Sequence, residues 1–164
     1  MQPAPASFRI EKTTPNDVPL ILQFIRELAE YEQLLQSVTT TEDRVRETLF
    51  GTDPAAYALL AYDSGQPVGF AIYFFNYSTF VGRPGLYLED LFVRPEARGK
   101  GFGRQLLAHL AGVAIERGCG RMEWAVLDWN EPALGFYKRL GATPMEDWTV
   151  FRLTDQALED LARK

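Results

Sequence analysis

Apolar positions in the first third of the chain repeat with two different periods. Phe8 and Ile10 alternate with polar neighbours, which predicts a short first strand. A Thr14-Pro15-Asn16-Asp17 start signal then precedes apolar residues at helical spacing, which predicts a helix ending near Tyr31. Those apolar positions are Val18, Ile21, Leu22, Ile25, Leu28 and Ala29.

A second helix and a group of strands follow. The Thr/Glu/Asp cluster at 39–43 opens a shorter helix, which Gly51 ends by accepting a left-handed cap conformation. Two β-forming runs, 56–62 and 68–77, flank a turn at 63–66 and predict a hairpin. With the apolar strand at 86–93, they form an antiparallel meander of three strands.

The last part of the chain alternates helices with strands. A long helix ends at Gly118, a strand covers 121–127, Asn130 caps the next helix, a strand covers 148–153, and Thr154 caps a terminal helix. This order predicts an α/β sandwich with a mixed sheet, joined at one point by a right-handed parallel crossover. We expect a single domain, 1–164, with a flexible tail at 1–6.

Composition and charge narrow the classes of protein. A chain of 164 residues with 46% hydrophobic residues can bury a full core without metal or disulfide. A formal net charge of −5 argues against general nucleic-acid binding and suits a cationic small substrate. The single Cys119, the absence of a signal peptide and the absence of a membrane-spanning run predict a cytoplasmic protein.

A glycine-rich loop, Arg98-Gly99-Lys100-Gly101-Phe102-Gly103, lies between the 86–93 strand and the long helix. Backbone N–H groups without side chains around them, at a helix N-terminus, suit a phosphate or pyrophosphate. The alternative is a turn selected only for its geometry. The loop lacks both the Ser or Thr of a P-loop and the dinucleotide glycine spacing, so a kinase or dehydrogenase is not expected.

Two adjacent carboxylates, Glu89 and Asp90, interrupt the apolar strand at 86–93. Successive side chains point to opposite faces, so even with a small bulge at least one carboxylate lies on an otherwise buried face. Such a group needs hydrogen bonds, a cation or a proton. A structural salt bridge or an edge position is the alternative interpretation.

Other candidate residues carry weaker signals. Tyr137 lies at the edge of an apolar helix face, where periodicity alone favours half-buried packing. His109 and Cys119 are the only residues of their kinds, so Ser-His-Asp, Cys-His and zinc sites are poorly supported and no metal is expected.

These motifs together resemble the GNAT superfamily of N-acetyltransferases, and within it the diamine acetyltransferases. The loop at 98–103 fits the arginine-x-x-glycine-x-glycine signature in its strand-loop-helix setting. Further similar segments are Glu27-Leu28-Ala29-Glu30-Tyr31-Glu32, Tyr87-Leu88-Glu89-Asp90, Trp129-Asn130-Glu131-Pro132, Phe136-Tyr137-Lys138-Arg139 and Trp148. The resemblance spans nearly the whole chain and implies the GNAT fold, a mixed, mostly antiparallel sheet with helices on both faces.

The resemblance also implies a division of labour around acetyl-CoA. Tyr137 would protonate the leaving thiolate as general acid, and Glu89 would hold the amine and take its proton, directly or through water. The residues implied to bind acetyl-CoA are Leu91, Phe92, Val93, Arg98, Gly99, Lys100, Gly101, Phe102, Gly103, Arg104, Asn130, Glu131, Pro132 and Ala133. Those implied to line the acceptor end are Tyr31, Glu32, Glu89, Asp90, Glu123 and Glu146.

The expected acceptor is a small diamine, polyamine or lysine analogue. Polyamine enzymes of this family have an acidic residue where this chain has Ser78, and Ser78-Thr79 with the 126–130 segment looks closer to the thialysine branch. Members of that branch are homodimers, so a homodimer is expected here. A catalytically silent acyl-CoA-binding module and an acetyltransferase for protein amino groups remain the alternative functions.

Overall fold

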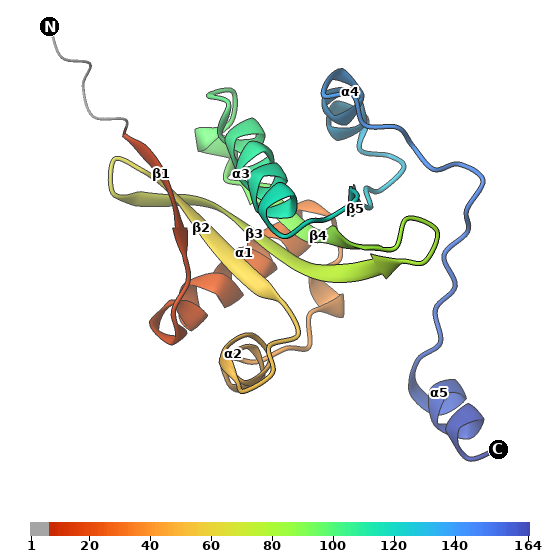
Figure 1. Cartoon of the computed structure of the whole chain (residues 1–164). Helices are drawn as coiled ribbons and strands as arrows, with labels where there is room; N and C mark the ends of the chain where they lie inside the picture. Colours follow the sequence, from red (N-terminus) through yellow and green to blue (C-terminus); the bar gives the residue numbers. More distant parts are fainter. Residues whose placement is uncertain (1–6) are drawn as a thin grey trace, which may run out of the picture. The chain divides into compact units, whose positions relative to one another are not determined.

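The computed structural model describes residues 7–164, which divide into two compact units, one ending at Ala125 and the other spanning Val126–Lys164. The first contains a five-stranded sheet of order β1-β2-β3-β4-β5 (Figure 1). Its strands are β1 (Phe8–Lys12), β2 (Tyr57–Asp63), β3 (Gln66–Ser78), β4 (Arg83–Val93) and β5 (Met122–Trp124). All neighbouring pairs are antiparallel except β4 and β5, which run parallel.

Helices cover both faces of this sheet, as the resemblance implied. The helical segments of the first unit are η1 (Pro15–Asp17), α1 (Val18–Tyr31), η2 (Leu35–Ser37), α2 (Glu42–Phe50), η3 (Pro95–Ala97) and α3 (Phe102–Glu116). Helices α1 and α2 pack on one face, and α3 lies on the other against β4 (Figure 1). The helix predicted to end near Tyr31 is present as the single turn η1 followed directly by α1.

The core between α1, α2 and the sheet explains the helical spacing of the first third of the chain. Its buried residues are Val18, Ile21, Phe24, Val45, Ala58, Leu60, Phe70, Ile72 and Phe92. On the α3 face, Leu86 of β4 and both Leu106 and Leu110 of α3 are completely buried. Phe102, the first residue of α3, stacks on Phe8 of β1 with ring centroids 4.3 Å apart.

Local signals in the sequence account for the ends of several elements. Asp17 accepts hydrogen bonds from the Thr14 N–H at 2.7 Å and from its hydroxyl at 3.3 Å, which forms the expected start of the first helix. Ser64 and Gly65 both have positive φ, 51° and 82°, as a tight two-residue hairpin turn requires. Ser78 is buried at the other hairpin, where its hydroxyl accepts a hydrogen bond from the Val81 N–H at 3.3 Å.

Strand β4 contains an irregularity at the carboxylates. Asp90 lies opposite Ile72 and Leu88 opposite Tyr73 on β3, so Glu89 is an extra residue in β4. A small β-bulge was allowed for, but not predicted, from the pair of adjacent carboxylates. Because Asp90 shares its side of the sheet with Ile72, its carboxylate faces α1.

The second unit contains two helices, α4 (Glu131–Arg139) and α5 (Asp155–Ala162). Asn130 caps α4, its side-chain oxygen accepting from the Ala133 N–H at 3.4 Å. Thr154 precedes α5, as expected. No helix in the described part of the chain is long and apolar enough to cross a membrane.

Three expectations need comment. The prediction of a strand at 148–153 is wrong, because this segment has no regular structure in the described chain. Its apolar pattern is compatible with a strand, but a strand also needs a hydrogen-bonded neighbour, and the sheet ends at β5.

Gly51 ends α2 at a φ of −74° rather than in the left-handed region, and a Cβ there would lie 2.4 Å from the Glu47 carbonyl oxygen. The predicted tail, 1–6, lies outside the described residues.

Candidate functional site

Strand β4 is covered by neighbouring strands along only part of its length. On one edge, β3 pairs with β4 as far as Val93. On the other edge, the parallel pairing with β5 stops at Leu88, which lies opposite Trp124. In the sheet of the first unit, residues 89–93 therefore have an edge without a strand neighbour, where backbone N–H and C=O groups can bind an extended ligand. Leu91, Phe92 and Val93, the residues predicted to pair with acetyl-CoA, lie on this segment.

The two carboxylates of β4 have different surroundings. Glu89, the extra residue of the bulge, is exposed, whereas Asp90 is half-buried on the α1 face. Burial raises the pKa of Asp90 to about 7, and the negative charges of Glu89 and Glu32 contribute to the rise. At neutral pH, Asp90 is therefore close to half protonated, and a nearby cation would favour its charged form.

Further acidic groups extend this region along the same face of the sheet. Glu32, directly after α1, is half-buried, and its pKa is raised by that burial. Tyr87 has its pKa raised by burial and by the charges of Glu89 and Glu123. Glu123 of β5 lies opposite Tyr87 of β4 and forms an ion pair with Arg121 at 3.0 Å. The structure thus brings together four of the predicted acceptor residues, Glu32, Glu89, Asp90 and Glu123, in a region suited to a cationic amine.

The glycine-rich loop has the backbone geometry of an anion site. Gly99 and Gly101 have φ values of 80° and 82°, which other residues rarely adopt. Gly103 is helical, and a Cβ built on it would meet nothing within 4 Å. The Gln105 N–H donates to the Gly101 carbonyl, so the amides of residues 102–104 precede the first helical bond and can point toward a ligand.

The basic residues of the loop make different contacts. Arg98 donates from Nε to the Val93 carbonyl at 2.8 Å, and its guanidinium lies 4.7 Å from the Tyr31 ring centroid. Lys100 forms an ion pair with Asp63 at 3.5 Å, while Arg104 is exposed on the first turn of α3. In this structure Arg98 therefore connects the open end of β4 with the end of α1.

The second unit holds the remaining predicted residues. Asn130, Glu131, Pro132 and Ala133 form the capped first turn of α4. Tyr137 is half-buried on the same helix, with its ring 5.5 Å from that of Phe136. Glu146 is exposed in the segment after α4. The catalytic and binding roles of all the site residues remain predictions.

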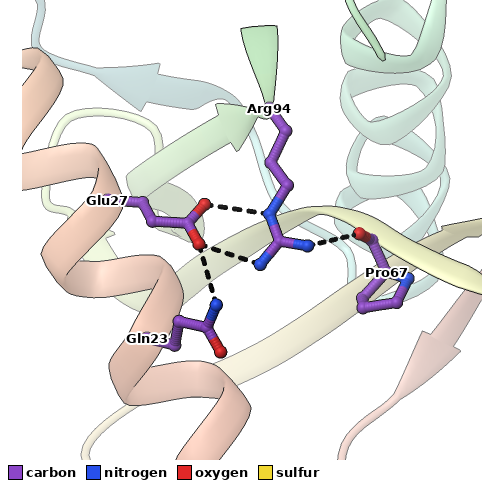
Figure 2. A network of polar contacts seen from close by, with 4 residues as sticks. All are labelled: Gln23, Glu27, Pro67 and Arg94. Atoms are coloured by element: carbon purple, nitrogen blue, oxygen red, sulfur yellow. Dashed lines mark hydrogen bonds and ion pairs between the residues drawn. The ribbon is translucent and has the colours of Figure 1, made fainter. Parts of the chain in front are cut away.

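One polar network was not expected from the sequence. Glu27 of α1 accepts two hydrogen bonds from Arg94, which directly follows β4 (Figure 2). The only signals available were an arginine immediately after the strand and a glutamate within the 27–32 motif. No group of three or more His, Cys, Asp and Glu side chains that could hold a metal occurs among residues 7–164.

Comparisons with known proteins agree with this geometry. Residues 22–142 match the Acetyltransferase (GNAT) family. A thialysine N-epsilon-acetyltransferase from Sus scrofa is 42% identical, over 97% of this chain and 99% of that protein. An L-ornithine acetyltransferase from Arabidopsis thaliana is 32% identical, over 92% of this chain and 86% of that protein.

A solved structure supports the fold. An integron cassette protein from the mobile metagenome of V. cholerae superposes with a TM-score of 0.80 and 28% identity, covering 96% of this chain and 99% of the other. The match over most of the chain and the extent of the thialysine relatives confirm the resemblance inferred from the motifs. The chain is therefore an N-acetyltransferase of the GNAT family, in its thialysine acetyltransferase branch.

Proposed function

We propose that this N-acetyltransferase moves the acetyl group of acetyl-CoA to the terminal side-chain amine of a lysine-like or ornithine-like amino acid. The observation that carries the proposal is the position of Glu89 and Asp90 on β4, directly beside the strand edge that β5 leaves open. Carboxylates hold a cationic amine, and an open strand edge pairs with an amide-containing arm. The acceptors named for two relatives, thialysine and L-ornithine, both carry an amine at the end of a side chain and support this choice.

The described residues fit acetyl-CoA as co-substrate. Gly99, Gly101 and Gly103 leave the backbone amides before α3 accessible to pyrophosphate oxygens. Arg98, Lys100 and Arg104 supply positive charge next to them. The backbone of Leu91, Phe92 and Val93 would pair with the pantetheine arm. The resemblance also assigns Asn130 to Ala133, in the first turn of α4, to binding the cofactor.

The amine attacks the thioester carbonyl directly, within a ternary complex, so that a C–N bond forms and the C–S bond breaks. Glu89 takes the proton that the ammonium must lose, directly or through water. Tyr137 donates its phenolic proton to the departing thiolate, because a phenol of pKa about 10 and a thiol of pKa about 8.5 are close enough for this exchange. No histidine or cysteine is needed for either transfer.

The acceptor end of the site has acidic groups at several depths. Glu32 and Asp90 are half-buried, which raises the pKa of both, and a bound cation would favour the charged form of each. Glu123 and Glu146 are further acidic candidates for binding an α-ammonium group or a second amine. Ser78, whose hydroxyl is already used within its own turn, contributes no charge.

A thiol-release assay with acetyl-CoA and a panel of amines tests the proposal. We expect release with thialysine, lysine and ornithine, and weaker release with spermidine. Release only with peptides would favour a protein amino group as acceptor. Binding of CoA without release for any acceptor would favour the silent acyl-CoA-binding module, and either result would contradict the proposal.

Replacing Tyr137 with Phe tests the general acid. This change removes one hydroxyl and keeps the ring that packs on Phe136. We expect kcat to fall by about 100-fold, the range typical of a lost general acid, with unchanged affinity for acetyl-CoA by calorimetry. Tyr77→Phe is the matched control, because Tyr77 is an exposed tyrosine on β3 outside the proposed site. Unchanged kcat in Tyr137→Phe would remove Tyr137 from this role.

We also propose that the enzyme is a homodimer, as the resemblance to this branch implies. Sedimentation equilibrium at micromolar protein should give twice the 18.6 kDa mass of the chain. A mass of one chain across the concentration range of the activity assay would contradict it.

A further inference from the structure

We propose that Glu27 and Arg94 are positioning residues for acetyl transfer, which hold the acceptor end of α1 at a fixed place relative to the open edge of β4. This inference rests on the proposed function, because that function assigns the amine to the end of α1 and the cofactor to the open edge of β4. It adds a pair of residues that contact neither substrate.

The Glu27–Arg94 network joins three segments that are far apart in sequence (Figure 2). Arg94 donates from Nε and Nη2 to the two carboxylate oxygens of Glu27, at 2.9 and 2.8 Å. Its Nη1 donates to the Pro67 carbonyl at 2.9 Å, and Gln23 donates to Glu27 at 3.1 Å. Each of the three guanidinium nitrogens therefore donates to a partner in α1 or β3.

Packing restricts the same pair further. The Arg94 guanidinium lies 4.6 Å from the ring centroid of Phe24, a fully buried core residue. The side chains of Arg94 and Glu27 are only 19% and 28% exposed. The hydrogen bond from Arg94 is the main reason that the pKa of Glu27 is lowered, so the pair is ionised at neutral pH. A bidentate, partly buried pair with this geometry fixes orientation as well as distance.

The positions of the two residues connect the two halves of the site. Glu27 precedes Tyr31 by one helical turn, and Glu32 follows directly. Arg94 comes immediately after Val93, and its own N–H donates to the Val68 carbonyl at 2.8 Å. A change in the pair therefore shifts the predicted amine-binding end of α1 relative to the backbone that is predicted to bind the cofactor.

A second arginine makes a parallel contact at the far side of the short turn η3. Arg98 donates to the Val93 carbonyl and stacks over Tyr31 and Phe92, at 4.7 and 5.5 Å. Arg98 is also predicted to bind pyrophosphate, so this contact is subject to exchange with the ligand. Arg94 is not predicted to bind the ligand, so its contact with Glu27 does not compete with ligand binding.

Two variants test the proposal. Glu27→Gln keeps size but removes the charge, and Arg94→Lys keeps charge but cannot form the bidentate pair. We expect kcat/KM for the amine to fall by about 10- to 100-fold in each, the loss typical of a small misplacement of reacting groups. Affinity for acetyl-CoA, measured by calorimetry, should change far less. The double variant should lose no more than the worse single one, because both changes break the same contact.

Matched controls separate positioning from stability. Val45→Ala removes packing from the same core, on α2, and should lower the urea midpoint without lowering kcat/KM. Asp43→Asn breaks an exposed ion pair with Arg46 and should change neither. If Glu27→Gln lowers only the urea midpoint, as Val45→Ala does, the role is structural and the proposal is wrong.

The wild-type enzyme distinguishes failure of this inference from failure of the proposed function. Release of CoA by wild type together with unaffected kcat/KM in both variants contradicts the positioning role alone. No release by wild type with any amine contradicts the proposed function, and the inference falls with it.

Discussion

The two halves of β4 differ in how completely they are covered. Residues 86–88 have β3 on one edge and β5 on the other, and Leu86 and Leu88 are buried beneath α3. Residues 89–93 keep only the β3 neighbour in the sheet, and they begin with a bulge and two carboxylates. The first half is apolar core, whereas the second half combines polar side chains with an open backbone edge.

This difference suits one strand both to stabilising the fold and to the proposed chemistry. A central strand with both edges paired has no backbone groups left for a ligand. Ending β5 at Trp124 frees those groups while β3 still holds β4 in place. The residues of β4 that are predicted to bind the amine and the cofactor therefore lie where the sheet opens, next to a segment rigid enough to position them.

The largest expected difference between the two halves is in the free energy of unfolding lost when one leucine in each is replaced with alanine. Leu86 is completely buried, so Leu86→Ala should lower the free energy of unfolding by about 2–5 kcal/mol. Leu91 points to the same face but is only half-buried, so Leu91→Ala should cost clearly less. Urea denaturation measures both. Equal losses would mean that the two halves are equally covered.

Asp90, in the second half of β4, should make the stability of the fold depend on pH. The pKa of Asp90 is about 7 in the folded chain, whereas that of an ordinary aspartate is 3.8, so between about pH 4 and 7 the folded state holds a proton that the unfolded state has lost. Stability therefore falls as pH rises through this window, by at most about 1.4 kcal/mol per pH unit, and levels off above it. Asp90→Asn should remove this contribution in urea titrations at a series of pH values. Parallel curves for wild type and variant would contradict it.

The smallest effect is expected at the loop that follows β4. Gly103→Ala places a methyl group beside the amides predicted to bind pyrophosphate, and should weaken acetyl-CoA affinity by about 3- to 10-fold, or roughly 1 kcal/mol. As a helical Gly→Ala change in open space, it should also stabilise the fold by about 0.5–1 kcal/mol. Gly112→Ala, also in open space on α3, is the matched control and should stabilise without changing affinity. Equal affinities in both variants would place the pyrophosphate elsewhere.

Much of this fold could be predicted because its signals are local. The β2–β3–β4 meander, α3 and the capped start of α4 follow from period, turn residues and caps, which depend on a few neighbouring residues. The glycine loop was also predictable, since positive φ at Gly99 and Gly101 is a requirement of the backbone itself.

Features that depend on distant partners were less accessible. The apolar pattern at 148–153 indicates a preference for burial, but no local signal shows whether a neighbouring strand is present. The Glu27–Arg94 pair joins residues 67 positions apart, so the local sequence around either residue does not identify its partner. Asp90 was a candidate from its residue type, whereas its raised pKa depends on burial and on Glu32 of another element.

The stacking of Phe8 on Phe102 links the glycine loop to the far edge of the sheet. Strand β1 is a five-residue edge strand bonded only to β2, and such strands open locally more often than the core. Each opening removes the ring that supports the first residue of α3, and with it the alignment of the amides before that helix. A ligand that binds those amides should therefore slow hydrogen exchange in β1, although β2 and β3 separate β1 from β4 in the sheet.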